Sequence, residues 1–290
     1  MIRGAVVWAA AVAALLPTLP VGAEPHPQAA RVLAIGGSIT EIIYALGQQD
    51  RLIARDTTSS YPAEAQALPD VGYMRALSPE GVLSVGPDLI LSEEGAGPPE
   101  AIAVLQEAGV PFETIAGGTD ADGLIGKVQA VADTLGVPEA AAAPIAALRA
   151  DLDQLATLAA QAGPTKKKIL FVLFVTDGRI TASGKGTEAD AIIRMAGAEN
   201  AIGDVDGYKP LTDEAITAAA PDIILTMTRG DAGDDMDAKA AELLAMPAIA
   251  TTPAGKAGKV ITMDGLYLLG FGPRTGKAGL DLHDAVYGEP

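Results

Sequence analysis

From residue 31 onward, short apolar runs alternate with segments of helical spacing. In the first half of the chain the apolar runs lie at residues 31–35, 51–54, 89–91 and 110–115. The first helical stripe is formed by Ile39, Ile42, Ile43 and Leu46, which fall at positions i, i+3, i+4 and i+7. Strands that alternate with helices over short connections predict a mostly parallel sheet with helices on its faces.

Two helix starts carry local signals. After a pair of glycines, Ser38 and Glu41 have the spacing of a capping box, in which a hydroxyl and a carboxylate satisfy the first N–H groups of a helix. Further along, Ser78 precedes Pro79, the order expected of a helix cap followed by the first helical residue. We therefore expect a helix to begin at each of these serines.

The second half of the chain repeats the plan of the first. Strands are expected at 169–175 and 259–263, with helices after the glycine-rich turn at 184–187 and near 273–274. The unit Leu77-x-x-Glu80, with its downstream Pro-Asp-apolar run, recurs at the same spacing as Leu211-x-x-Glu214. An internal repeat of this kind predicts two similar lobes.

Residues 122–163, between the repeats, lose the strand signal and are rich in Ala and Leu. Within them, the stretch 145–162 has one apolar face and would form a stiff helix roughly 27 Å long. The predicted fold class is therefore α/β, with two Rossmann-like lobes, each a mostly parallel sheet flanked by helices, joined by one long α-helix. We expect the N-terminal lobe at 24–138, the connecting helix at 139–165 and the C-terminal lobe at 166–290.

Residues 1–23 combine Arg3, an uncharged apolar stretch up to Leu16, and small residues ending at Ala23. This order is typical of a secretory signal peptide, and Pro17 interrupts the stretch before it could span a membrane. We expect export to the periplasm with cleavage near Ala23 and no stable membrane insertion. The sequence has no cysteine, which excludes a lipid-bearing cysteine, disulfides and thiolate metal sites.

The net charge of −17 argues against nucleic acid as a partner, because nucleic acid requires a basic surface. Catalytic patterns are also missing: the glycine-rich turns match no phosphate-binding motif, and neither His26 nor His283 is placed for a catalytic triad. We therefore favour a binding protein over an enzyme. Its ligand would lie at the carboxyl ends of the strands, in a cleft lined by loops at 36–38, 56–62, 72–75, 176–185, 226–231 and 265–271.

Tyr73 and Arg75 stand in the loop before the Ser78 helix. A tyrosine at such a place can be a partly buried packing residue, or its phenolate oxygen can bind ferric iron, as it does in some haem proteins. Arg75 lies two residues further along and so on the same face of an extended segment. A cation there would lower the tyrosine pKa and favour the ligating form. On the residues alone, both interpretations stay open.

Glu80 and Glu214 occupy the same position in the two repeats. Either acid alone is explained as a first-turn carboxylate that stabilises a helix N-terminus. Their repetition also suits a partner with two-fold symmetry, which would contact one acid on each lobe.

Several strings of this sequence recur together in one known family. They are Gly-Gly-Ser-Ile-Thr-Glu at 36–41, the loop at 56–62, Gly-Tyr-Met-Arg-x-Leu-Ser-x-Glu-Gly at 72–81, Tyr-x-Pro-Leu at 208–211 and Gly-Phe-Gly-Pro-Arg at 270–274. With them the chain resembles the periplasmic haem-binding proteins of bacterial ABC-type haem importers. These belong to a cluster of substrate-binding proteins that includes vitamin B12 and ferric siderophore binders.

The resemblance implies roles for particular residues. Tyr73 would be the axial iron ligand, Arg75 its neighbour in the pocket, and Arg229 a residue that reaches the haem propionates or the tyrosine. Glu80 and Glu214 would dock onto arginines of the membrane permease. Some relatives add a histidine ligand from the second lobe, but the loop at 175–179 contains none, so Tyr73 is expected to be the sole protein ligand.

The expected function is therefore capture of haem b, as transported cargo, and its delivery to the permease and ATPase of an inner-membrane ABC importer. We expect the carrier to be a monomer. The first alternative is the same fold with a ferric siderophore or cobalamin as cargo. The second, from a different class, is a haem-using enzyme or redox protein.

Overall fold

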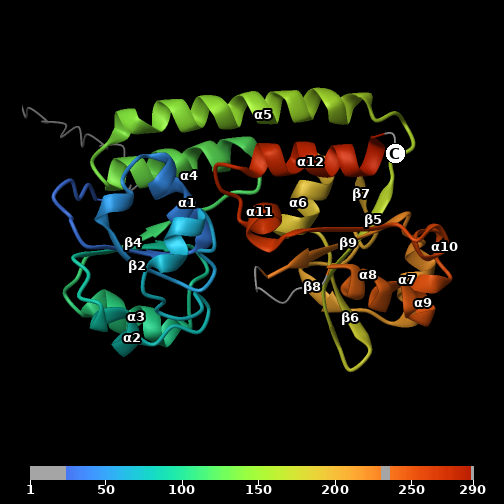
Figure 1. Ribbon diagram of the computed structural model, residues 1–290, viewed down its shortest axis with the longest axis horizontal. Helices are drawn as coiled ribbons and strands as arrows, with labels where there is room; N and C mark the ends of the chain where they lie inside the picture. The colour runs from blue at the N-terminus through green and yellow to red at the C-terminus, as the bar shows by residue number, and fades with distance from the viewer. Residues whose placement is uncertain (1–23, 230–235, 289–290) are drawn as a thin grey trace, which may run out of the picture.

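The computed structural model describes residues 24–229 and 236–288 as two α/β lobes that share a layer of long helices (Figure 1). The expected signal peptide, residues 1–23, lies outside the described residues. Figure 1 shows helix α5 (Ala142–Gln161) running across both lobes, with α4 (Ala121–Thr134) and α12 (Thr275–Tyr287) packed beneath it. The predicted fold class, two α/β lobes joined by one long helix, is confirmed.

The N-terminal lobe is built on a parallel sheet with the strand order β2-β1-β3-β4. The strands are β1 (Val32–Ile35), β2 (Leu52–Arg55), β3 (Leu89–Glu93) and β4 (Phe112–Ile115). The sheet is joined by helices α1 (Gly37–Ala45), α2 (Pro79–Ser84) and α3 (Pro99–Glu107), and by short turns η1 (Gln49–Arg51), η2 (Ala63–Ala67) and η3 (Pro138–Ala141). All four predicted strands of this lobe are present. Each strand places apolar side chains in the core, on one face of the sheet or on both.

The C-terminal lobe has a mixed sheet with the order β10-β9-β5-β6-β8, and β7 also pairs with β5. The strands are β5 (Lys168–Thr176), β6 (Arg179–Ser183), β7 (Glu199–Asn200), β8 (Tyr208–Pro210), β9 (Ile223–Thr228) and β10 (Val260–Asp264). The helices of this lobe, besides α12, are α6 (Glu188–Met195), α7 (Asp213–Ala219), α8 (Met236–Ala245), α9 (Pro247–Ala250), α10 (Pro253–Ala257) and α11 (Gly265–Leu269).

Two of the expected loops are wrong: residues 265–269 of the loop expected at 265–271 form the short helix α11, and the loop expected at 176–185 is mostly strand. Residues 176–183 instead complete a hairpin, in which β6 pairs antiparallel with β5 around Asp177 and Gly178. Both turn residues have positive φ, 51° and 74°, as a two-residue Asp-Gly hairpin turn requires. The Asp-Gly pair is therefore a hairpin signal, and most of this segment is strand where a loop was expected.

The serine of α2 caps its helix as predicted, whereas the capping box at α1 is wrong. Ser78 Oγ accepts a hydrogen bond from the Gly81 amide, and Pro79 is the first helical residue. Helix α1 begins one residue earlier than expected, with Gly36 as its N-cap and no cap from Ser38. Ser38 donates to Glu93 instead. The first amides of α1 are satisfied by side chains of a distant loop, which frees Ser38 for a tertiary contact.

One hydrophobic cluster runs through both lobes and the shared helices. It contains strand residues of each sheet, such as Val32 and Phe171, together with Leu148 of α5 and Leu282 of α12. Helix α5 has 20 residues, begins three residues before the expected helical stretch 145–162, and buries Leu148, Leu152 and Leu155. A continuous core of this kind makes the connection between the lobes stiff, because a lobe rotation would expose packed apolar surface.

Among the described residues, no helix combines the length and the apolar character that a membrane span would need.

Candidate functional site

Tyr73 and Arg75 project from an ordered loop ahead of α2. Tyr73 is 45% exposed and Arg75 is exposed as well, whereas Met74 and Leu77 are buried in the lobe's core. The backbone is fixed by hydrogen bonds from the Gly97 amide to the Met74 carbonyl, 2.8 Å, and from the Leu77 amide to the Gly97 carbonyl, 2.9 Å. The loop therefore presents Tyr73 and Arg75 to solvent on a rigid base.

The positive charge of Arg75, in the N-terminal lobe, acts on Tyr208 of β8 in the C-terminal lobe. Burial, followed by the negative charge of Glu188, raises the pKa of Tyr208 to about 12. The positive charge of Arg75 acts in the other direction and favours the phenolate. The Tyr208 hydroxyl lies 3.5 Å from Glu188 Oε2, to which it donates.

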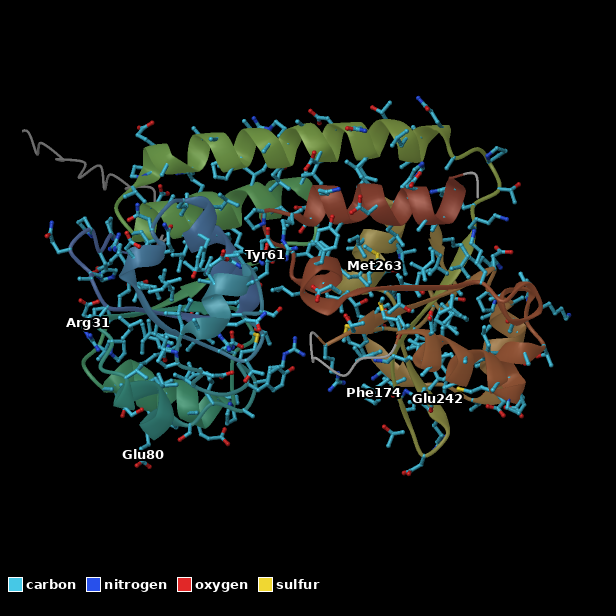
Figure 2. The ribbon with its side chains drawn as sticks, viewed as in Figure 1. Arg31, Tyr61, Glu80, Phe174, Glu242 and Met263 are labelled. Atoms are coloured by element: carbon cyan, nitrogen blue, oxygen red, sulfur yellow. The ribbon has the colours of Figure 1, made fainter. Side chains whose placement is uncertain are left out.

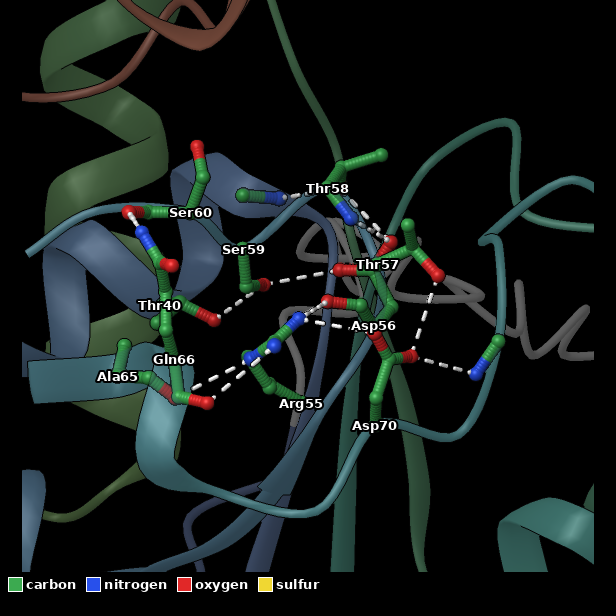
Figure 3. Close-up of polar contacts among 12 residues, drawn as sticks. Thr40, Arg55, Asp56, Thr57, Thr58, Ser59, Ser60, Ala65, Gln66 and Asp70 are labelled. Carbon is green, nitrogen blue, oxygen red and sulfur yellow. Dashed lines mark hydrogen bonds and ion pairs between the residues drawn. The ribbon is translucent and has the colours of Figure 1, made fainter. Parts of the chain in front are cut away.

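A buried carboxylate, Asp56, organises the loop that follows β2 (Figure 3). Its Oδ1 accepts hydrogen bonds from the Gly36 amide, 3.0 Å, and the Ser59 hydroxyl, 2.9 Å. Its Oδ2 accepts from the Thr58 amide and hydroxyl, at 3.0 and 2.7 Å. Thr58 Oγ1 in turn accepts from the Gly37 amide. The loop and the start of α1 are therefore held by one carboxylate.

The same loop is tied to the base of the Tyr73 loop. The Thr57 amide donates to the Gly72 carbonyl, 3.0 Å. Asp70 Oδ1 accepts from both the Gly72 amide, 2.8 Å, and the Thr57 hydroxyl, 3.1 Å, and its other oxygen pairs with Arg55. Figure 3 shows this network. Residues 55–60 and 70–72 therefore form one hydrogen-bonded unit, which sets the position of Tyr73.

The lobes meet through Arg274, which begins α12. Its Nε donates to Glu41 Oε2 of α1 at 2.9 Å, and Nη2 donates to the other carboxylate oxygen. Its guanidinium carbon lies 3.6 Å from the ring centroid of Tyr61 and 4.9 Å from that of Tyr267. Figure 2 shows Tyr61 on the side of the N-terminal lobe that faces the C-terminal lobe. Arg274 thus joins side chains from both lobes.

A second polar contact between the lobes centres on Lys127 of α4, whose side chain is 2% exposed. Its Nζ donates to Glu93 Oε1 at 2.6 Å and to the Phe271 carbonyl at 3.0 Å. Ser38 donates to the same Glu93 oxygen at 2.8 Å. Sequence reasoning missed this cluster. The available signal was a lysine on the apolar stripe of a helix, which predicts a buried partner.

Arg229 lies in the C-terminal lobe, at the end of β9. It lines a cavity of about 240 Å³ together with Phe174, Thr226, Lys239 and Glu242. Phe174 is 40% exposed, and Figure 2 shows it close to Glu242. The structure thus separates Arg229 from Tyr73, which belongs to the other lobe. The cavity is lined by an aromatic ring, two cationic side chains and one carboxylate, that of Glu242.

Glu80 and Glu214 stand in equivalent settings, each exposed in the first turn of a short helix. Thr212 caps α7 as Ser78 caps α2, by accepting from the amide three residues on. Hydrogen bonds from its own backbone amide and from Thr212 lower the pKa of Glu214. Figure 1 shows α2 and α7 on the sides of their lobes away from α5, and Figure 2 shows Glu80 at the outer end of its lobe. Both acids are therefore available to a partner on that side.

Across residues 24–229 and 236–288, no group of three or more His, Cys, Asp and Glu side chains is arranged to hold a metal ion.

Solved structures of similar proteins match the whole two-lobed architecture. The periplasmic heme-binding protein BhuT, in complex with two hemes, is 42% identical; the match covers 88% of this chain and 97% of that one with a TM-score of 0.82. The periplasmic heme-binding protein RhuT from Roseiflexus sp. RS-1, in apo form, is 36% identical over 92% of this chain and 98% of that one, also with a TM-score of 0.82.

Curated relatives are more distant. The vitamin B12-binding protein of Yersinia pestis (strain Pestoides F) is 28% identical over 78% of this chain and 79% of that protein. The uncharacterized ABC transporter substrate-binding lipoprotein YvrC of Bacillus subtilis (strain 168) is 28% identical over 73% of this chain and 66% of that protein, just under two thirds. Residues 32–267 match the family model described as periplasmic binding protein. With a match over most of its length, the chain belongs to the periplasmic binding protein family.

Proposed function

We propose that this protein is a periplasmic carrier that captures haem b between its lobes and delivers it to an inner-membrane ABC importer. The observation that carries the proposal is the exposed Tyr73, held two residues from the exposed Arg75 on a rigid loop. The 42% identity to a periplasmic heme-binding protein supports the choice of cargo. The carrier would bind its cargo without converting it.

Tyr73 would bind the ferric ion through its phenolate oxygen. Tyrosine is an established axial ligand of haem iron. The guanidinium of Arg75 would favour the ionised phenol and donate hydrogen bonds to it or to a cargo carboxylate. On the opposite lobe, Arg229 stands beside Lys239 at one cavity and would offer positive charge to the haem propionates. Each lobe thus contributes a different part of the recognition.

Hemin titration tests the ligand assignment. Wild type should give the ferric charge-transfer band of a phenolate-ligated haem, and Tyr73→Phe and Tyr73→Ala should lose this band and bind hemin more weakly. Tyr44→Phe, the same change at a partly buried tyrosine of α1, is the matched control and should behave as wild type. Retention of wild-type affinity and of the band in Tyr73→Ala would remove Tyr73 from the site.

Cobalamin is the second candidate cargo, because the vitamin B12-binding proteins of Yersinia are among the relatives. A ferric siderophore would suit the same fold. Protein purified from haem-rich cells should show a Soret band if haem is the cargo, whereas a siderophore complex has none. Saturable binding of cyanocobalamin with no response to hemin would replace haem by cobalamin. Ready transfer of bound haem to apomyoglobin would speak against a haem enzyme.

Glu80 and Glu214 are proposed to dock onto arginines of the permease. Their support is the equivalent exposed placement at the first turns of α2 and α7. The double variant Glu80→Gln/Glu214→Gln should keep its hemin affinity but lose stimulation of the transporter ATPase. Glu100→Gln, at another exposed first turn, is the control. If the double variant stimulates the transporter ATPase as wild type does, both acids serve only to stabilise the N-termini of their helices.

The remaining assignments are also proposals. We propose lobes at 24–138 and 166–290 with a connecting helix at 139–165, export with cleavage near Ala23, and a monomeric carrier. The mass of the exported protein, with an N-terminus at Glu24, and its hydrodynamic size would check the last two.

A further inference from the structure

Tyr61 is an aromatic residue that stays partly exposed although its ring packs against a cation. Its side chain is 45% exposed although one face of the ring lies 3.6 Å from the Arg274 guanidinium carbon. The cation covers that face, and the residue nonetheless keeps nearly half of its surface exposed. Figure 2 shows Tyr61 at the side of the N-terminal lobe that faces the C-terminal lobe. A large aromatic side chain fixed at one face and open elsewhere is arranged to stack on another flat group.

The position of this ring is set by both lobes. Arg274 comes from the C-terminal lobe and is anchored by two hydrogen bonds to Glu41, whose side chain is 5% exposed. Tyr267 lies on the guanidinium as well, 4.9 Å from its ring centroid to the guanidinium carbon. The Tyr267 hydroxyl is itself bound to Asp281 at 2.7 Å. Arg274 therefore cannot swing away from Tyr61 without breaking a buried ion pair.

Tyr61 is also coupled to the Tyr73 loop. Both tyrosines follow directly from the unit of residues 55–60 and 70–72, in which Thr57 bonds to Gly72 and both bond to Asp70. Gln66 adds a hydrogen bond to the Ser60 carbonyl at 2.8 Å, next to Tyr61. The two tyrosines are therefore carried by one hydrogen-bonded element, which fixes their backbone positions relative to one another.

We propose that Tyr61 is a further cargo-contacting residue, which stacks on a planar conjugated macrocycle, and that Arg274 positions it from the opposite lobe. This inference rests on the proposed function, since the macrocycle is the porphyrin of haem. It assigns the two tyrosines different parts of the cargo: Tyr73 the iron, Tyr61 the ring system. Stacking by Tyr61 needs no metal, whereas ligation by Tyr73 does.

Two ligands separate these contributions: hemin and metal-free protoporphyrin IX. Tyr61→Ala should weaken the binding of both by the same factor, about two- to tenfold, the range expected for one aromatic contact. Tyr61→Phe should bind both as wild type does, because it keeps the ring. Tyr73→Phe should weaken hemin only. Val104→Ala, at an exposed apolar residue of α3, is the control and should leave both affinities unchanged.

The positioning role of Arg274 has its own readout. Arg274→Lys keeps the charge beside Glu41 but loses the planar group under Tyr61, so it should weaken both ligands. If it acts through Tyr61, the double variant Tyr61→Ala/Arg274→Lys should bind no more weakly than Tyr61→Ala. A double variant weaker than either single variant would overturn this role.

The outcomes for Tyr61 are equally distinct. If wild type binds both ligands and Tyr61→Ala binds protoporphyrin IX with wild-type affinity, the stacking inference fails and haem capture stands. Loss of hemin binding alone in Tyr61→Ala would also overturn it, because stacking does not depend on iron. If wild type binds neither ligand, the proposed function fails and this inference with it.

Discussion

Arg274 of the C-terminal lobe and Glu41 of the N-terminal lobe form a two-pronged ion pair, with Nε of Arg274 2.9 Å from Oε2 of Glu41. The carboxylate is almost fully buried. Burial raises the pKa of Glu41, and the hydrogen bond and charge of Arg274 lower it again in part. The buried charge of Glu41 therefore requires Arg274 as its partner, because an unpaired buried carboxylate destabilises the fold.

Removing Arg274 should therefore destabilise the protein far more than removing a surface arginine. Arg274→Met would leave Glu41 buried and unpaired, and we expect the free energy of unfolding to fall by about 3 kcal/mol. The double variant Glu41→Gln/Arg274→Met should lose less than the sum of the single variants, because neither charge then remains alone. Urea unfolding of the four proteins measures the coupling.

Lys277→Met is the matched control, since Lys277 pairs with Asp281 at an exposed position of α12. This change should alter the free energy of unfolding by less than about 0.5 kcal/mol. If Arg274→Met costs no more than Lys277→Met, the pair between the lobes contributes no more than an exposed one.

Asp56 gives a second prediction, which links stability to cargo binding. Asn at this position keeps the shape but replaces one acceptor oxygen by an amino group facing two donors. We expect Asp56→Asn to lower the free energy of unfolding by about 2 kcal/mol. It should also weaken hemin binding, because the same loop holds Gly72 next to Tyr73. Unfolding and hemin titration check both parts.

Asp122→Asn is the control for Asp56→Asn, because Asp122 is an exposed acid in the first turn of α4. It should change the free energy of unfolding by only a few tenths of a kcal/mol. A stability of Asp56→Asn within that same range would mean that the loop does not depend on the carboxylate.

Elements of the fold were predictable where their signals are local. The Ser78-Pro79 start of α2 is predictable because cap and first turn are adjacent in sequence. The capping box at Ser38 failed because its side chain binds Glu93, 55 residues away, and the first amides of α1 are satisfied by another loop. A local pattern cannot report which distant group competes for the same side chain.

The residues of the candidate site also differ in whether their signals are local in the sequence. Tyr73 and Arg75 could be singled out because one short loop carries both. The stacking of Tyr61 on Arg274 could not, because the partners come from opposite ends of the chain and meet only when the lobes are assembled. Lys127 had a usable signal, its place on the apolar face of α4, but its partners Glu93 and Phe271 had none.

Tyr208 predicts a pH dependence of stability. The ordinary phenol pKa is 10.0, and burial, then the charge of Glu188, raises that of folded Tyr208 to about 12. Its contribution to stability is therefore fully present below pH 10 and is lost as the pH rises towards 12, since the unfolded chain ionises first. Between pH 8.5 and 10.5, the stability of Tyr208→Phe relative to wild type should rise by about 1 kcal/mol.

Urea unfolding of both proteins at several pH values measures this difference, and the interval from pH 7 to 8.5 serves as the internal control. No change is expected there, because the phenol is protonated in both states. A stability difference that stays constant up to pH 10.5 would show that Tyr208 ionises alike in the folded and unfolded chains.

Gly37 lies where the two lobes are in close contact. A β-carbon at this position would lie 2.6 Å from the Thr58 carbonyl oxygen and closer still to the side chain of Leu266, which belongs to the other lobe. Leu266 could move, but the backbone oxygen is fixed by the loop that Asp56 holds. We expect Gly37→Ala to lower the free energy of unfolding by about 1–3 kcal/mol and to weaken hemin binding.

Gly126→Ala is the matched control, because Gly126 lies exposed inside α4 with open space around it. That change should stabilise the protein by up to about 1 kcal/mol through helix propensity. Equal stability of the two variants would mean that the lobes do not require a glycine where they meet.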